Sequence, residues 1–464
     1  MGNWLNTLNT SREARAIKPQ VLKFQAGIDN RSREYALGEG AARTLTNVDV
    51  TRDGGLLCRK GTRQLHTGDF HSFFAHPTQR YALVVQDNVL HRLDPDHTLT
   101  ALTPVSGQVA YAILNDQVHW TDGSSVGLVT AQGELGTWGL NPPPAPIVTA
   151  VTNGGLFSGA YTLAMTAIDA TGLESPASTL ITLNVVEGGG IEIVTPAASG
   201  VQFAIYRTTQ NGPATSLRRA TLAAPGTTVL LGEAPLGKPL ESLYAVRPFP
   251  GQCLVQHKGR LWCASGKALW FTSEYSPHWL FPSQGFYQFE STIQTLSPTE
   301  DGIYVGLESR ILYLQGSNPA EMTQRPVSSV GAAAGPSMEL PYDLFLGEGS
   351  FPSRQSAFMD RDGYLCIGKP GGIIVRPTQS RYSAGGLISG IGTYRVCEGL
   401  RQVLFLAGQS PVQCHWATDQ AIQTVFENGI TLDVTVNPVG NYLFADDGAS
   451  YLFADDAATY LQQA

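Results

Sequence analysis

Two pairs of neighbouring carboxylates are the groups best suited to acid–base chemistry in this sequence of 464 residues: Glu300 with Asp301, and Asp360 with Asp362. A glycoside hydrolase, for example, uses two carboxylates on either side of the bond that it cleaves. Both pairs, however, fall in polar turns between apolar stretches, where Asp is favoured because its side chain stabilises the turn. We therefore interpret them as turn residues and expect no catalytic residue among them.

The sequence carries no other motif with the spacing that catalysis or metal binding requires. It lacks HExxH and the glycine motifs that bind phosphates or dinucleotides, and its GxSxG match, GSSVG (123–127), is followed by a strand-like stretch and not by the helix that a nucleophile elbow requires. The segment HWTDGSSVG (119–127) is only loosely similar to the Asp-box of sialidases. We expect that the chain is not an enzyme and that it binds neither a metal nor a cofactor.

The six cysteines form no CxxC pair. Most of them lie in apolar, strand-like stretches, which favours buried, reduced thiols over zinc ligands or disulfides. They are Cys58, Cys253, Cys263, Cys366, Cys397 and Cys414.

The elements that position these residues repeat along the chain. Each repeat has a polar turn, about four apolar residues, a second turn and a closing apolar strand, which is the pattern of a β-hairpin. The repeats cover residues 82–102, 112–130, 258–273, 297–316 and 357–377. Fifty Gly, 28 Pro and only 15% charged residues also suit many short strands joined by tight turns. We therefore predict an all-β, propeller-like body built of repeated hairpins; separate sandwiches with similar turns are the alternative.

The hairpin at 258–273 contains Trp262, Cys263 and Trp270. In a propeller these side chains pack between neighbouring blades, because each blade buries both faces against its neighbours. The alternative is a stacking site for a sugar or a base. We expect the packing role.

A proline-rich stretch, NPPPAPIVTA (141–150), interrupts the hairpins. Proline favours extended backbone here, so a domain boundary is expected. The following hundred residues alternate apolar and polar side chains between turn signals, which predicts an inserted β-sandwich. The expected units are an N-terminal segment with a first hairpin (1–65), first blades (66–140), the sandwich (141–245), further blades (246–415) and C-terminal strands with a repeat tail (416–464).

Within the sandwich, YTLAMTAIDATGLESPAS (161–178) and IYRTTQNG (205–212) resemble fibronectin type III and related immunoglobulin-like modules, in particular those inserted in viral tail proteins. The early Trp usual in such modules is missing. The resemblance implies a decorating or spacing role for this unit.

The stretch AGIDNRSREYALGEGAARTLTNVDVTRDGGLLCRKGTRQL (26–65) is the most informative in the chain. Its order of motifs resembles the N-terminal signature of tail nozzle or tail-hub proteins of short-tailed bacteriophages, which include packaged-DNA-stabilisation proteins. Lys60 stands where that family commonly has Pro. The segment SGKALWFTSEYSPHWLFP (265–282) is similar to a recurrent blade segment of the same family.

This resemblance implies a structural virion protein of the phage tail, made in the host cytoplasm. It implies a homohexameric ring below the portal and the tail adaptor, in contact with tail fibres, through which double-stranded DNA passes without specific binding. Such a ring conducts the genome and helps to retain packaged DNA. The alternative function is a glycan-binding or glycan-cleaving β-propeller of a viral or bacterial surface.

The distribution of charge is compatible with assembly. Residues 1–65 carry eleven Lys and Arg against six Asp and Glu, whereas seven acidic residues and no Lys or Arg follow Arg401. This asymmetry favours docking between copies or partners, and a net charge of −8 disfavours tight binding of DNA. We expect no secretory signal and no membrane anchor, because no apolar stretch of the required length and composition is present.

The C-terminal stretch 441–464 contains the hexapeptide YLFADD twice, nine residues apart. We interpret each copy as a short strand and a turn, and expect the strands to add to a sheet edge of their own body, a neighbouring subunit or a tail-fibre protein. A calcium-binding array, which needs more glycine, and a frayed terminus are the alternatives. The candidate interaction residues are Tyr442, Leu443, Phe444, Tyr451, Leu452 and Phe453.

Overall fold

The computed structural model describes residues 23–45, 48–51, 53–58, 62–344, 352–387, 389–397 and 400–408, together with five C-terminal strands. The described part of the chain is all-β, as predicted. Its helical elements are the 3-10 turns η1 (Glu34–Ala36), η2 (Ala214–Ser216), η3 (Pro282–Gln284) and η4 (Pro370–Gly372). None of the helices within these ranges has the length and apolar character that a membrane span requires.

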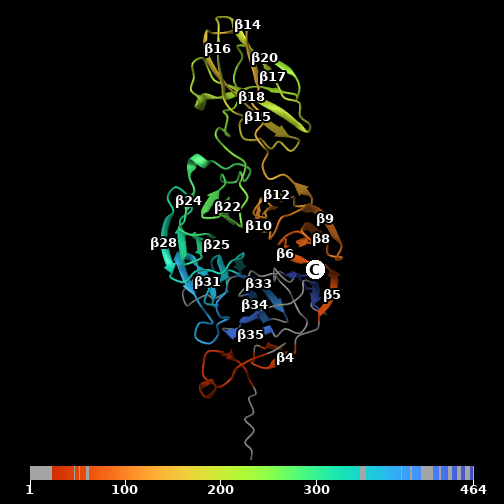
Figure 1. Ribbon diagram of the computed structural model, residues 1–464, viewed down its shortest axis with the longest axis vertical. Coiled ribbons are helices and arrows are strands. Elements are labelled where there is room, and N and C mark those ends of the chain that lie inside the picture. Colours follow the sequence, from red (N-terminus) through yellow and green to blue (C-terminus); the bar gives the residue numbers. More distant parts are fainter. Residues whose placement is uncertain are drawn as a thin grey trace, which may run out of the picture.

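Seven four-stranded sheets, called blades 1 to 7 here, are arranged around one axis as a β-propeller (Figure 1). Blade 1 consists of β6 (Phe70–Ala75), β7 (Ala82–Gln86), β8 (Val89–Leu93) and β9 (Leu99–Pro104). Blade 2 consists of β10 (Ala110–Leu114), β11 (Gln117–Thr121), β12 (Val126–Val129) and β13 (Leu135–Gly136). Blade 3 consists of β21 (Cys253–His257), β22 (Arg260–Ser265), β23 (Ala268–Phe271) and β24 (Tyr287–Gln288).

The remaining blades follow in chain order, each with its innermost strand named first. Blade 4 consists of β25 (Ile293–Pro298), β26 (Gly302–Leu307), β27 (Ile311–Gln315) and β28 (Thr323–Ser328). Blade 5 consists of β29 (Met338–Leu340), β30 (Gln355–Met359), β31 (Leu365–Lys369) and β32 (Ile373–Val375). Blade 6 consists of β33 (Ser389–Cys397), β34 (Leu400–Gly408), β36 (Ile430–Val436) and β35 (Ile422–Glu427), and blade 7 of β39 (Tyr460–Gln462), β38 (Tyr451–Ala454), β37 (Tyr442–Asp446) and β5 (Thr62–Thr67).

Two-residue turns explain why the predicted hairpins form. Asp87 and Asn88 join β7 to β8 with φ angles of 51° and 62°, and Asn115 and Asp116 join β10 to β11 with 55° and 59°. Positive φ at both central residues defines a type I′ turn, which matches the right-handed twist of the strands. Asn and Asp tolerate this conformation better than other side-chain-bearing residues.

Apolar side chains between the blades form the core. Trp262 and Cys263 are both buried, as expected, and because side chains alternate along β22 they pack in opposite directions. Trp262 packs with Leu296 and Val305 of blade 4, whereas Cys263 joins an apolar cluster with blade 2. Neighbouring blades therefore share their cores, and no blade buries its apolar residues alone.

The prediction of buried thiols holds for three cysteines and is wrong for one. Cys253, Cys263 and Cys366 are buried, and burial raises the pKa of the Cys253 and Cys263 thiols to about 12. Cys58 is exposed, because it ends a strand of a two-stranded sheet that nothing else extends. The side chains of Cys397 and Cys414 lie outside the described residues.

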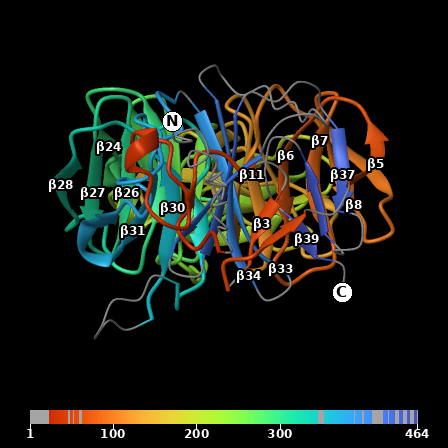
Figure 2. The ribbon, with the colours of Figure 1, turned by 90° about the horizontal axis from the view of Figure 1, so that it is seen from below.

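Strands from both ends of the sequence build blade 7. β5, from the N-terminal part of the chain, pairs antiparallel with β37, from the C-terminal part, and the two lie side by side in Figure 2. The innermost strand β39 contacts β33 of blade 6 and β6 of blade 1. The ring of blades therefore closes through pairing of the two ends of the chain.

The expected boundary between 415 and 416 needs correction, because it falls inside blade 6. β36, which lies beyond it, pairs in parallel with β34, so strands from both sides belong to one sheet. The boundary between 65 and 66 likewise falls within β5. Both boundaries were placed from local patterns, whereas these strands are assigned by pairing between distant segments.

A β-sandwich is inserted between β13 and β21, at the rim of the propeller, from which it projects (Figure 1). Its strands are β14 (Ile147–Leu156), β17 (Gly189–Val194) and β20 (Thr228–Leu231) in one sheet, and β16 (Ile181–Val185), β15 (Gly159–Asp169), β18 (Val201–Arg207) and β19 (Arg218–Ala223) in the other. The first strand pairs with the fourth, whereas in constant-type immunoglobulin domains the first pairs with the second. The likeness to fibronectin type III modules remains a prediction.

Residues 23–58, called the N-terminal segment here, form a small unit outside the blades. Its strands are β1 (Gly27–Ile28), β2 (Ala41–Ala42), β3 (Val48–Val50) and β4 (Leu56–Cys58). Ile28, Leu45 and Val50 are buried in a cluster with residues of blades 5 and 6. The unit lies on the opposite side of the propeller from the sandwich (Figure 1).

Removal of the C-terminal repeat is expected to open the ring. A chain that ends at Val439 lacks β37, β38 and β39, so β5 loses its partner and blades 6 and 1 lose the strands between them. The midpoint of thermal unfolding should fall by at least about 5 °C, equivalent to about 2 kcal/mol or more. Calorimetry of this chain, beside a control that ends at Gln462 and keeps all three strands, measures the effect; equal midpoints would contradict it.

Candidate functional site

The six candidate interaction residues of the C-terminal repeat lie in blade 7. Tyr442, Leu443 and Phe444 belong to β37, and the matching residues of the second copy belong to β38. The register sets Phe444 opposite Phe453 of the second copy, so the two copies form one hairpin. Three sheet edges were considered as partners of this stretch. In the structure it pairs with β5, an edge of the same chain. The side chains lie outside the described residues.

The first carboxylate pair is engaged in structural contacts. Glu300, in the β25–β26 turn of blade 4, accepts a hydrogen bond at 2.8 Å from Nζ of Lys258, in the β21–β22 turn of blade 3. Asp301 accepts hydrogen bonds from the Gly371 amide at 3.0 Å, from Gln315 at 3.2 Å and from the hydroxyl of a neighbouring tyrosine. These bonds tie blade 4 to the η4 turn of blade 5, so the carboxylates fix the positions of blades.

The second carboxylate pair also has a structural role, and part of it was not predicted. Asp360 is buried, accepts the Tyr364 amide at 2.9 Å in the expected turn, and forms an ion pair with Nε of Arg376 at 2.8 Å. Asp362, by contrast, is exposed. A buried carboxylate needs such a partner, because an unpaired buried charge is costly. This ion pair could not be predicted from local sequence patterns, because its two residues are 16 positions apart.

Among the described residues, no group of three or more His, Cys, Asp or Glu is placed to hold a metal ion.

Trp270 does not pack between the blades, in contrast to the expectation. It is half-buried and stacks on Phe286, with ring centroids 4.5 Å apart and an interplanar angle of 29°. Phe249 meets it edge-on at 5.1 Å. Phe249 comes from the segment that returns from the sandwich, so this segment covers Trp270 in place of a neighbouring blade.

These three aromatic residues, called the aromatic array here, expose part of their apolar surface. Phe286 is 45% exposed and Phe249 is 36% exposed. Aromatic faces of this kind bind the flat face of a sugar or a base by stacking. The array is therefore a candidate binding surface near the junction of the propeller and the sandwich.

The junction itself is built around Glu174, in the segment GLESPAS (172–178). Its buried carboxylate accepts hydrogen bonds from Thr166 at 2.7 Å, Tyr206 at 2.5 Å and Lys238 at 2.6 Å. Burial alone would raise the pKa of Glu174, but these hydrogen bonds outweigh burial and hold the pKa below its ordinary value.

Tryptophans of the propeller attach to this region. The indole N–H of Trp279, in the loop between β23 and β24, donates to the Glu174 carbonyl oxygen at 2.9 Å. The indole N–H of Trp138 donates to the Pro277 carbonyl oxygen of the same loop at 2.8 Å. These two hydrogen bonds fix the loop between blade 2 and the sandwich. They give the Trp, Pro and Glu residues of this region a structural role.

No family model matches the chain, and no curated protein matches it. Solved structures with similarity to it include the Pan2 WD40 domain of Neurospora crassa (8% identity, 72% of this chain and 84% of that chain, TM-score 0.30). Sqt1 of Saccharomyces cerevisiae is 11% identical over 82% of this chain and 99% of that one, with a TM-score of 0.27. The Dos1 propeller is 11% identical over 86% and 83%, with a TM-score of 0.28. The propeller assignment rests on the sheet order of the chain itself.

Acid is expected to destabilise the sandwich through Glu174. Because its pKa is lower in the folded chain than the ordinary 4.5, the ionised carboxylate contributes stability above about pH 4.5, and this contribution is lost as pH falls through the folded pKa. Glu174→Gln should lower the free energy of unfolding at neutral pH by about 2 kcal/mol and remove this part of the pH dependence.

Denaturant unfolding of both proteins between about pH 7 and about pH 3 measures this effect. Glu241→Gln, which changes an exposed carboxylate of the same region, is the matched control and should behave as the unchanged chain. A Glu174→Gln protein with unaltered stability at neutral pH would show that the carboxylate does not hold the junction.

Proposed function

We propose that the chain is a structural subunit of the tail nozzle or tail hub of a short-tailed bacteriophage, where copies form a ring that conducts the genome and helps to retain packaged DNA. The observation that carries the proposal is the position of two extra units on the propeller. The sandwich and the N-terminal segment lie at opposite sides of its rim (Figure 1). The N-terminal segment also contains most of the stretch that resembles this family.

Opposite units suit a ring, because each subunit of a cyclic ring contacts its two neighbours through two different surfaces. Both units also expose apolar side chains. In the N-terminal segment these are Leu56 and Leu57; in the sandwich they include Ile147 and Phe157. Large exposed apolar groups are typical of surfaces that bind other proteins.

The expected partners follow from this role: five further copies, the tail adaptor and portal ring, tail fibres, and double-stranded DNA in transit. The net charge of −8 supports passage of DNA without retention on the wall, because phosphates bind to dense Lys and Arg. The proposed role is not enzymatic, in keeping with the structural contacts of the carboxylates described above. The proposed location is the virion tail.

A second candidate function is glycan binding or cleavage by a surface propeller. The aromatic array favours it, since Phe249, Trp270 and Phe286 offer stacking surface for a sugar ring. Cleavage would need two carboxylates, and of the four considered all but Asp362 are engaged in the structural contacts of blades 3 to 5. Under this second function, glycan binding is therefore better supported than glycan cleavage.

Electron microscopy of the purified chain in negative stain, together with native mass spectrometry, tests the proposed function. The expected result is a closed ring of copies with a central channel. If the protein stays monomeric or trimeric and degrades polysaccharide, the proposed function is wrong and the second function is favoured.

Under the second function, Trp270→Ala is expected to weaken polysaccharide binding, because it removes the central ring of the aromatic array. A loss of binding affinity of about tenfold or more corresponds to the 1–3 kcal/mol that stacking on an aromatic side chain contributes. Isothermal titration with soluble polysaccharide measures it. Tyr342→Ala, which removes an exposed aromatic ring of blade 5 outside the array, is the control, and equal affinities of the unchanged and Trp270→Ala proteins would exclude the array as a glycan site.

A further inference from the structure

The loop at residues 29–36 of the N-terminal segment is held firmly by its own side chains and by the propeller. The Asp29 carboxylate accepts the Arg31 amide at 3.0 Å and the Ser32 amide at 2.8 Å. The side chain of Asn30 donates to the Ser383 carbonyl oxygen at 2.9 Å and accepts the Ser383 amide at 3.2 Å. A loop with this many fixed contacts loses little conformational entropy when it binds a partner.

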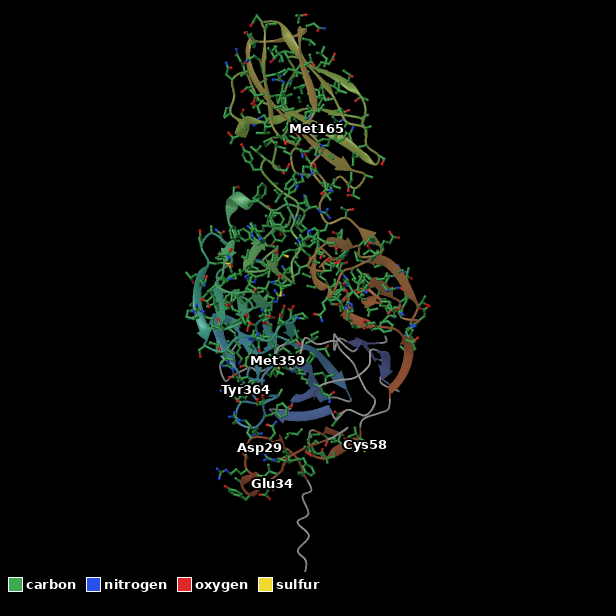
Figure 3. All side chains as sticks on the ribbon, viewed as in Figure 1. Asp29, Glu34, Cys58, Met165, Met359 and Tyr364 are labelled. Atoms are coloured by element: carbon green, nitrogen blue, oxygen red, sulfur yellow. The ribbon has the colours of Figure 1, made fainter. Side chains whose placement is uncertain are left out.

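This firmly held loop presents an aromatic side chain to solvent. Tyr35 is 80% exposed, the largest exposed fraction among the described large apolar and aromatic residues. The Arg33 guanidinium lies over its ring, 6.0 Å from the centroid, and donates to its hydroxyl at 2.6 Å. Figure 3 labels the neighbouring Glu34, which shows that the loop lies at the end of the molecule opposite the sandwich. Tyr and Arg are enriched among the residues that dominate protein–protein binding energy.

The same segment exposes apolar residues on a free strand. Within the described part of the chain β4 pairs with β3 alone, and its two leucines, Leu56 and Leu57, are both exposed. Consecutive residues of a strand point to opposite faces, so neither face of β4 is covered. The N-terminal segment thus combines an Arg–Tyr pair with uncovered apolar surface.

A surface of complementary character lies on the sandwich, at the other end of the molecule, where Figure 3 labels Met165. The outer face of the β14–β17–β20 sheet carries Ile147 directly opposite Val194, and Leu230 directly opposite Glu192. The three apolar residues are exposed, Ile147 to 69%, and Glu192 is exposed among them. This open face carries one acid among apolar side chains, whereas the N-terminal loop exposes Tyr35 together with two bases, Arg31 and Arg33, and one acid, Glu34, so its exposed charge is net positive.

We propose that the Arg33–Tyr35 pair of one subunit docks on the open β14–β17–β20 face of the next copy of this chain, with Arg33 against Glu192 and Tyr35 against the apolar residues. This inference rests on the proposed ring. The two surfaces lie at opposite ends of one chain, so the contact is heterologous and repeats from copy to copy until the ring closes. The Arg–Glu pair sets the register, and the tyrosine supplies apolar contact area.

A charge exchange tests this contact in the full-length chain. Arg33→Glu should weaken association between copies by about 30-fold, as should Tyr35→Ala, because each removes a dominant contact. Arg33→Glu combined with Glu192→Arg should restore assembly, since the ion pair is rebuilt in reverse. Sedimentation velocity over a range of concentrations measures association, and the melting temperature of each variant should match that of the unchanged chain because the altered groups are exposed.

Tyr342→Ala is the matched control, because Tyr342 is an exposed tyrosine of blade 5 outside both surfaces, and it should assemble normally. If the unchanged chain forms no ring, the proposed function fails. If the unchanged chain forms rings and the Arg33→Glu and Tyr35→Ala proteins form rings equally well, the proposed contact is wrong, but the proposed function is not contradicted. If Arg33→Glu blocks assembly and Glu192→Arg does not restore it, the loop binds another surface or protein, and the assignment to the sandwich is overturned.

Discussion

Backbone pairing between β5 and β37 is the constraint on which the rest of the propeller depends. In an open row of blades the first and last would each leave a core face in water, because blades bury their apolar residues against one another. Pairing of distant strands turns that row into a ring, so that blade 7 covers the apolar cluster around Phe70 and Val84 of blade 1, against which Leu65 of β5 packs. The two ends of the chain thereby stabilise blades that neither of them touches.

The position of the sandwich follows from the same architecture. Blades are joined at the rim, where the outermost strand of one passes to the innermost strand of the next, and a connection there can be lengthened without disturbing a core. The insertion between β13 and β21 uses such a connection. The contacts of Glu174 and Trp279 then fix the inserted unit to the body, so the molecule presents the sandwich in a defined direction.

Features that depend on neighbouring residues could be predicted from the sequence, and features that depend on distant ones could not. The turns at Asp87–Asn88 and Asn115–Asp116 follow from local backbone preferences, and so do the hairpins and the propeller class. The parallel pairing of β36 with β34, the partner of the C-terminal repeat and the aromatic neighbours of Trp270 all depend on which segments meet in space. Of the candidate sites, the repeat was recognised and a stacking site at Trp270 was the stated alternative, whereas Phe249 and Phe286 of the aromatic array and the Arg33–Tyr35 pair were not found.

The composition of blade 7 also sets the order of events during synthesis on the ribosome. The partner of β5, β37, lies far along the sequence and is made after a delay of about 20–80 s at typical elongation rates of ~5–20 residues per second. Throughout that interval β5 is an unpaired strand edge, of the kind that invites aggregation. Nascent chains are therefore vulnerable to aggregation for the whole of that interval, and chaperones that cover strand edges have their greatest effect then.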